Sequence, residues 1–172
     1  MRLLRQLVRG EGLAAAAFEL TDEEKQDMIE WLDGEIYTDN YDACKYTLMH
    51  LDMVLAGGKL LLTYDPNKVT VEHVLPQNPA SNSDWVQNFS EEQRESWTHR
   101  LGNLVILNRN RNSKAQNYDF EKKKRIYFKP GANLTNFNMT VQVLKETEWT
   151  PAVVEARHQD MLNLLYKSWD LK

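Results

Sequence analysis

Residues 71–77 have the sequence VEHVLPQ, and this stretch decides the fold that we expect. The alternating pattern of KVTVEHV, residues 68–74, predicts a short strand, and Pro76 ends it. Glu72 and His73 are neighbours on this strand, so their side chains point to opposite faces unless the strand bends there. A histidine at a strand end can take a proton from water, and we expect its side chain to face solvent. The alternative is a structural histidine.

A second polar stretch, LGNLVILNRNRNSKAQN at residues 101–117, follows thirty residues later. Its segment NLVIL predicts a second strand, and the polar run after it predicts a loop that leads into a helix. Amide oxygens from this loop suit Mg²⁺ or Mn²⁺, and the lack of further cysteines argues against structural zinc. Each asparagine taken alone could instead form a turn or a helix cap.

Helices are predicted on both sides of this pair of strands. Capping boxes begin two of them, with Thr21 paired to Glu24 and Ser90 paired to Gln93. Thr150 and Pro151 are typical of the start of a long closing helix. The expected helices cover residues 21–34, 41–58 (with Gly57 as C-cap), 90–100 and 149–171. Residues 108–128 are expected to form a polar loop that leads into a helix, with Lys114 and Asn117 at its start, and a further strand is expected at 59–65.

Composition indicates one globular domain with a small N-terminal extension. The chain has 172 residues, of which 42% are hydrophobic, and no apolar run approaches the length of a membrane span. Residues 1–20 do not form a signal peptide because Arg5, Arg9 and Glu11 interrupt the apolar run, so we interpret them as an upstream helix or linker remnant. The single cysteine, Cys44, suits a cytoplasmic protein.

Positive charge is concentrated in one window of an acidic chain. The net charge is −4, yet the window 100–129 has nine Lys and Arg residues against two acidic ones, a local charge of +7. Such a patch favours a site for a polyanion, although a run such as KKKR alone is more often a solvated helix face.

Several motifs occur together in a characteristic order. They are EHVLPQ at residues 72–77, Trp85, HRLGNLVILNRNRNSKAQN at 99–117, Phe120 followed by KKK, and finally Trp149 and Arg157. This chain resembles the His-Me finger (HNH-type) nucleases, specifically the C-terminal domain of the GmrSD-type modification-dependent restriction endonucleases, over about Thr21 to Trp169. The resemblance implies an α+β domain, residues 21–172, with a ββα-metal core inserted among flanking α-helices.

The resemblance also implies roles for individual residues. His73 would be the general base, and Glu72 would be the acidic metal ligand. Asn103 would take the position of the central asparagine, which orients the histidine or its loop. Asn112 would take the last motif position and be the second ligand of one Mg²⁺ or Mn²⁺ ion, while His99 is a secondary candidate. The expected DNA contacts are Arg109, Arg111, Lys114, Asn117, Lys122, Lys123, Lys124 and Arg125.

Metal-dependent cleavage of DNA phosphodiesters is the function implied by this resemblance. This domain would then be the C-terminal, effector part of a longer phage-defence protein that acts on phage or modified DNA with an N-terminal ParB-like nucleotide-binding domain, away from membranes. Two alternatives remain: a degenerate DNA-binding or regulatory module, and a helical protein-interaction domain. The second explains the flanking helices but not the motifs.

Overall fold

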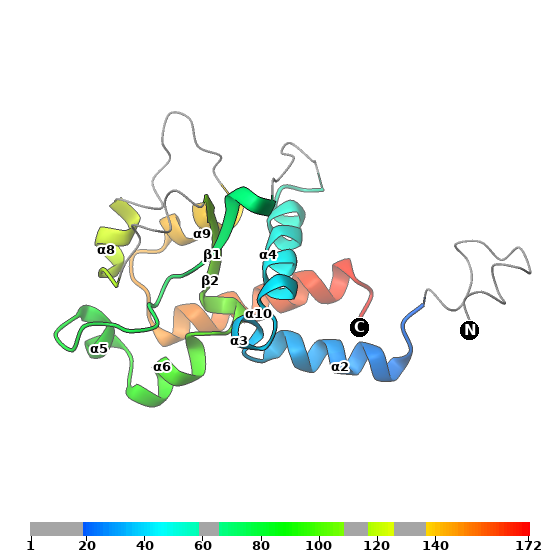
Figure 1. The fold of residues 1–172 in the computed structure, drawn as a ribbon, viewed down its shortest axis with the longest axis horizontal. Coiled ribbons are helices and arrows are strands. Elements are labelled where there is room, and N and C mark those ends of the chain that lie inside the picture. The colour runs from blue at the N-terminus through cyan, green and yellow to red at the C-terminus, as the bar shows by residue number, and fades with distance from the viewer. Residues whose placement is uncertain (1–18, 59–65, 109–116, 126–136) are drawn as a thin grey trace, which may run out of the picture.

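Helices surround one small antiparallel sheet in the described part of the chain (Figure 1). The structure is a computed structural model that describes residues 19–58, 66–108, 117–125 and 137–172. The two strands are β1 (Val69–His73) and β2 (Leu104–Asn108). The mixed architecture confirms the predicted α+β class. The predicted strand at 59–65 lies outside the described residues.

The described helices lie before, between and after the strands in the chain. In chain order they are α2 (Asp22–Asp33), α3 (Ile36–Asp39), α4 (Tyr41–Leu55), η3 (Pro66–Lys68), α5 (Asp84–Asn88), α6 (Glu91–Trp97), η4 (Leu101–Asn103), α8 (Phe120–Lys123), α9 (Asn138–Lys145) and α10 (Pro151–Ser168). No helix among the described residues combines the length and apolar character needed to cross a bilayer.

The predicted helix starts are confirmed by their caps. Thr21 and Glu24 form a reciprocal capping box at α2, and Ser90 and Gln93 form another at α6. The Thr150 side chain accepts from the third amide of α10. The end of α4 differs slightly from the prediction, because Ala56 is the C-cap and Gly57, with φ of 72°, follows it.

Both strands are buried along most of their length, which explains their apolar sequence. The register runs from Val69 opposite Asn108 to His73 opposite Leu104. Helices α4 and α9 contact β2, and α10 packs against η4, the turn that precedes β2 (Figure 1). Since the sheet is covered by helices, β2 buries Leu104 to Leu107 without alternation.

Helices α3, α5 and α9 were not predicted from the sequence, and α9 shows one reason. Its N-cap, Phe137, has no side-chain oxygen to accept from the first turn. The acceptor comes from α4 instead, where the buried carboxylate of Asp52 accepts from the Met139 amide over 2.8 Å. A cap supplied from 87 residues away leaves no local signal.

Candidate active site

His73 is the last residue of β1, and the hairpin fixes its backbone. It pairs with Leu104, the first residue of β2. The amide of Val74 then donates to the carbonyl of Asn103 over 3.0 Å. The histidine is thus held at the point where the chain leaves the sheet, as the sequence predicted.

Three side chains, from His99, Gln77 and Tyr37, enclose the His73 imidazole. Its Nε2 lies 3.3 Å from Nδ1 of His99, and the amide nitrogen of Gln77 lies 3.4 Å from its Nδ1. The Tyr37 ring of α3 meets the imidazole edge-on, with ring centroids 4.4 Å apart. His73 is only 5% exposed. The expectation that its side chain faces solvent is therefore wrong, because the neighbouring rings cover it.

Burial keeps the His73 imidazole neutral. Desolvation, with smaller contributions from the nearby His99 and Lys123, lowers its pKa to about 3. Because an amide nitrogen only donates, Nδ1 accepts from Gln77, and Nε2 carries the proton that it donates to His99. This neutral imidazole can accept a proton at Nδ1 once the contact with Gln77 opens.

His99 connects this cluster to the protein surface. Its ring stacks on Tyr37, with ring centroids 5.6 Å apart, and its carbonyl accepts from the Tyr37 amide over 3.3 Å. It lines a hollow of about 420 Å³ together with Gln77 and Glu35. Burial lowers the pKa of His99, and the Glu35 carboxylate opposes this shift. The His73–His99 pair therefore has a buried member and a member that lines an open hollow.

Glu72 points away from this cluster and forms a buried ion pair. Its Oε1 lies 2.9 Å from Nζ of Lys123, which also donates to the His73 carbonyl over 2.6 Å. Burial raises the pKa of Glu72 and lowers that of Lys123, and their mutual attraction opposes both shifts. Neighbouring strand residues thus do point to opposite faces, so Glu72 and His73 do not share one pocket.

Asn103 holds the loop that follows His73. It is fully buried, its Oδ1 accepts from the Leu75 amide over 2.7 Å, and its Nδ2 donates to the carbonyls of Leu75 and Thr98, each over 2.9 Å. The indole of Trp149 also donates to Oδ1 over 3.2 Å. These bonds join the backbone after His73 to the backbone before His99. Asn103 is therefore placed to position the histidine pair.

Helix α10 clamps the LGNL segment around Asn103. The Arg157 guanidinium donates to the carbonyls of Gly102 and Leu104, and Nδ1 of His158 accepts from the Gly102 amide over 3.1 Å. Nε2 of His158 in turn contacts Asp33 of α2 over 2.8 Å. Burial lowers the pKa of Arg157 to about 9, so the guanidinium stays charged at neutral pH. The distant Arg157 of the motif set thus supports the hairpin.

The expected DNA contacts have different environments. Asn117 and Arg125 are exposed, while Lys122 and Lys124 are partly buried, with Lys122 over the Tyr118 ring. Lys123 is 1% exposed, so its expected place on a DNA-contacting surface is corrected: its ammonium faces Glu72 in the interior. Four expected site residues lie outside the described part of the chain: Arg109, Arg111, Asn112 and Lys114.

Two residues of the cluster were missed in the sequence. Gln77 belongs to the quoted VEHVLPQ stretch, and its spacing of four residues from His73 was the available signal. Tyr37 had no such signal, because it lies in the four-residue helix α3 and reaches the cluster only through the packing of α3 and α4.

A metal ion at Glu72 would compete with Lys123 for the carboxylate. The described residues contain no group of three histidine, cysteine or acidic side chains close enough to hold a cation. The Glu72 carboxylate already faces the Lys123 ammonium, so a cation there would have to displace the lysine or use the second oxygen. Within the described part of the chain, the residues therefore do not form a ready metal site.

Together the hairpin, the positioned histidine and the clamped asparagine define an α+β domain with a candidate site for acid–base chemistry. Residues 21–164 match the family described as GmrSD restriction endonucleases, C-terminal domain. The chain belongs to this family, whose members are nucleases of the restriction type. No curated protein matches the chain.

Proposed function

We propose that this domain hydrolyses DNA phosphodiester bonds as the effector of a modification-dependent restriction protein, and that its hairpin and following helix form an HNH-type ββα-metal core. The observation that carries the proposal is His73. It is a neutral imidazole at a strand end, held between Gln77 and His99, in a chain of a restriction-endonuclease family. A neutral imidazole can act as a general base on water.

In this proposal the cluster divides the work between positioning and proton transfer. His73 accepts a proton from the attacking water at Nδ1 after its contact with Gln77 opens, and Asn103 keeps the two histidine-bearing segments in register. The departing oxygen then needs a proton, and His99 is our candidate to supply it. Because His99 lines the open hollow, it can regain this proton from solvent.

A hard cation, Mg²⁺ or Mn²⁺, would stabilise the charge that develops on the phosphate. Asn112 remains our proposed ligand for this ion. Glu72 can join it only in competition with Lys123, which makes Glu72 the weaker part of the proposed pair.

DNA would bind through the basic residues that follow β2. Arg125 is exposed, and the ammonium of Lys122 lies 3.3 Å from the centroid of the Tyr118 ring at the start of this segment. Arg109, Arg111, Lys114 and Asn117 complete the proposed phosphate contacts. An upstream ParB-like domain remains the proposed partner.

One observation favours the alternative of a DNA-binding module without catalysis. The Glu72 carboxylate is paired with the buried ammonium of Lys123, and such pairing is typical of a structural ion pair. In that case the basic segment would still bind DNA, and His73 would serve only to fill space between Tyr37 and His99.

The deciding experiment incubates the chain with supercoiled plasmid DNA and with phage DNA, in Mg²⁺, Mn²⁺ or EDTA. We expect cleavage with either ion and none in EDTA. Asn112→Ala should lose cleavage that excess Mn²⁺ partly restores, while Asn163→Ala, an exposed control on α10, should cut normally. Undiminished cleavage in EDTA would contradict metal dependence. DNA binding without cleavage under every condition would favour the alternative.

A further inference from the structure

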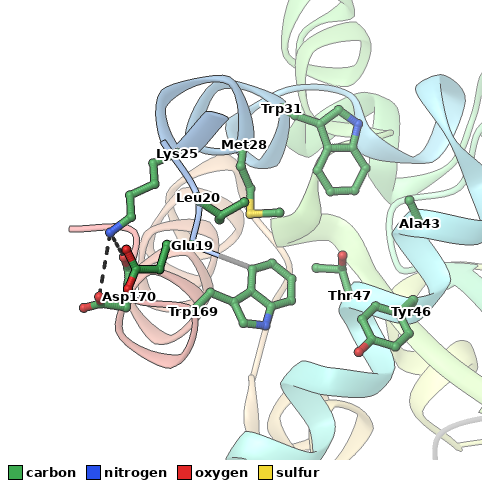
Figure 2. Close-up of a pocket in the computed structure, with 10 residues that line it drawn as sticks. All are labelled: Glu19, Leu20, Lys25, Met28, Trp31, Ala43, Tyr46, Thr47, Trp169 and Asp170. Atoms are coloured by element: carbon green, nitrogen blue, oxygen red, sulfur yellow. Dashed lines mark hydrogen bonds and ion pairs between the residues drawn. The ribbon is translucent and has the colours of Figure 1, made fainter. Parts of the chain in front are cut away.

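A wide apolar groove lies between α2, α4 and the end of α10, outside the candidate active site. It has a volume of about 750 Å³, and Figure 2 shows Met28 and Trp31 of α2, Tyr46 of α4 and Trp169 around it. Three large hydrophobic side chains are exposed in the described part of the chain, and two of them, Leu20 and Tyr46, line this groove. Such a concentration of apolar surface indicates a docking site.

Helix α2, which forms one side of the groove, is acidic. Lys25 at one end is held by Asp170, with its Nζ 2.6 Å from the Asp170 carbonyl and 3.7 Å from its carboxylate. Helix α2 has six acidic residues and Lys25 as its one basic residue. A second copy would bring two such acidic helices together, and nucleic acid would be repelled. The charge therefore favours an occupant with an apolar face and positive charge.

The chain contains such a segment shortly before Glu19 and Leu20 in the sequence. Residues 1–9, MRLLRQLVR, have leucines or valine at positions 3, 4, 7 and 8 and arginines at 2, 5 and 9. At helical spacing the four apolar residues fall on one side and the arginines on the other. This is the pattern that an apolar groove beside an acidic helix selects.

The connection to the groove is short and sufficient. Residues 1–18 lie outside the described part of the chain, and the first described residues, Glu19 and Leu20, line the groove themselves. The nine residues 10–18 can span up to about 30 Å when extended. A tether of this length gives an effective concentration on the order of millimolar, so a weak contact suffices.

We propose that residues 1–9 dock as an amphipathic helix in the groove between α2, α4 and α10, with their apolar side in the groove and their arginines on the outer side, in the field of the acidic helix α2. This proposal is independent of the nuclease chemistry, because no residue of the groove belongs to the His73 cluster.

The test uses the full chain labelled with 5-fluorotryptophan, because Trp31 and Trp169 line the groove. Their ¹⁹F signals are assigned with Trp31→Phe and Trp169→Phe. The variant Leu4→Ser/Leu7→Ser removes apolar contacts, and Gln6→Ser/Gly10→Ser is the matched control. We expect the leucine variant to shift both groove signals while those of Trp85 and Trp149, buried elsewhere, report an intact fold. Tryptic cleavage after Arg5 and Arg9 should accelerate roughly tenfold or more, since two apolar anchors are lost.

Unchanged Trp31 and Trp169 signals in the folded leucine variant would overturn the proposal. A shift of these signals with protein concentration in the wild-type chain would overturn it as well, because the occupant would then be a second copy. Equal shifts in the leucine variant and in its control would also overturn the proposal. The shifts would then follow from any change in residues 1–10 and not from the loss of apolar contacts.

Discussion

Lys122 and Lys123 are neighbours in the chain with opposite environments. Lys122 lies over the Tyr118 ring near the surface, whereas Lys123 is buried against Glu72. Lys123→Met should destabilise the fold by about 3–5 kcal/mol, because it leaves a buried carboxylate without its partner. Thermal unfolding measures this effect, and restoring part of the loss with Glu72→Gln in the double variant confirms its cause.

Lys122→Met is the matched control, and it should change DNA binding instead. It should cost less than about 1 kcal/mol of stability and lower the salt dependence of DNA affinity by about one phosphate contact. The opposite outcome, with Lys123→Met stable and deficient in DNA binding, would show that Lys123 leaves the interior to meet DNA.

Asn103 and His73 show how far the sequence could predict the site at single positions. Asn103 was expected to open the NLVIL strand, and it immediately precedes β2. The resemblance implied that it orients the histidine or its loop. This role stays a prediction, and its bonds to Leu75 and Thr98 are the contacts through which it would act. Its partner Trp149 could not be derived, because the contact joins residues 46 positions apart. The prediction that the His73 side chain faces solvent is wrong, because the Tyr37 ring of helix α3 covers its imidazole.

The contact of η4 with α10 leaves no room for a side chain at Gly102. A Cβ there would lie 2.6 Å from the Val154 carbonyl and 2.7 Å from Cβ of His158. Gly102→Ala should therefore cost about 2 kcal/mol or more, because backbone must shift. Chemical denaturation measures the change. Gly34→Ala is the control, with its nearest atom at 3.3 Å, and an equal loss in both variants would contradict the close-approach explanation.

Elements with local caps were predictable, and those held by distant partners were not. Helices α2, α6 and α10 carry their own N-cap signals, and the predicted strands KVTVEHV and NLVIL are observed as VTVEH and LVILN. Helix α9 depends on Asp52 of α4, and helix α3 has only four residues, so neither is visible in a local pattern. The clamp of α10 on η4 is likewise a tertiary feature.

The whole domain should lose stability in mild acid. Burial lowers the pKa of all four histidines: His50, His73, His99 and His158. A group whose pKa is lower in the folded state binds fewer protons there, so its stabilisation is present above the unfolded value of about 6.5 and is lost as pH falls. The raised pKa of Glu72 acts in the opposite direction at more acidic pH.

Thermal unfolding between pH 7.5 and 5 checks this expectation. The deeply buried His73 should contribute a slope of up to roughly 1.4 kcal/mol per pH unit. His73→Gln should reduce the slope, whereas the same change at the less buried His50 should reduce it less. A domain whose stability stays constant or rises as pH falls to 5 would contradict the buried, neutral histidines.

The central claim, that His73 is the base of a DNA-cleaving site, is tested most directly by the cleavage rate of His73→Gln on supercoiled plasmid with Mn²⁺. Glutamine can keep a hydrogen bond to His99 or Gln77 but cannot act as a general base. We expect the rate to fall by roughly a hundredfold or more while DNA affinity and the folded spectrum are retained. His50→Gln, a histidine outside the cluster, should cut at the wild-type rate. A folded His73→Gln protein that cuts as fast as wild type would contradict the account and make His99 the next candidate.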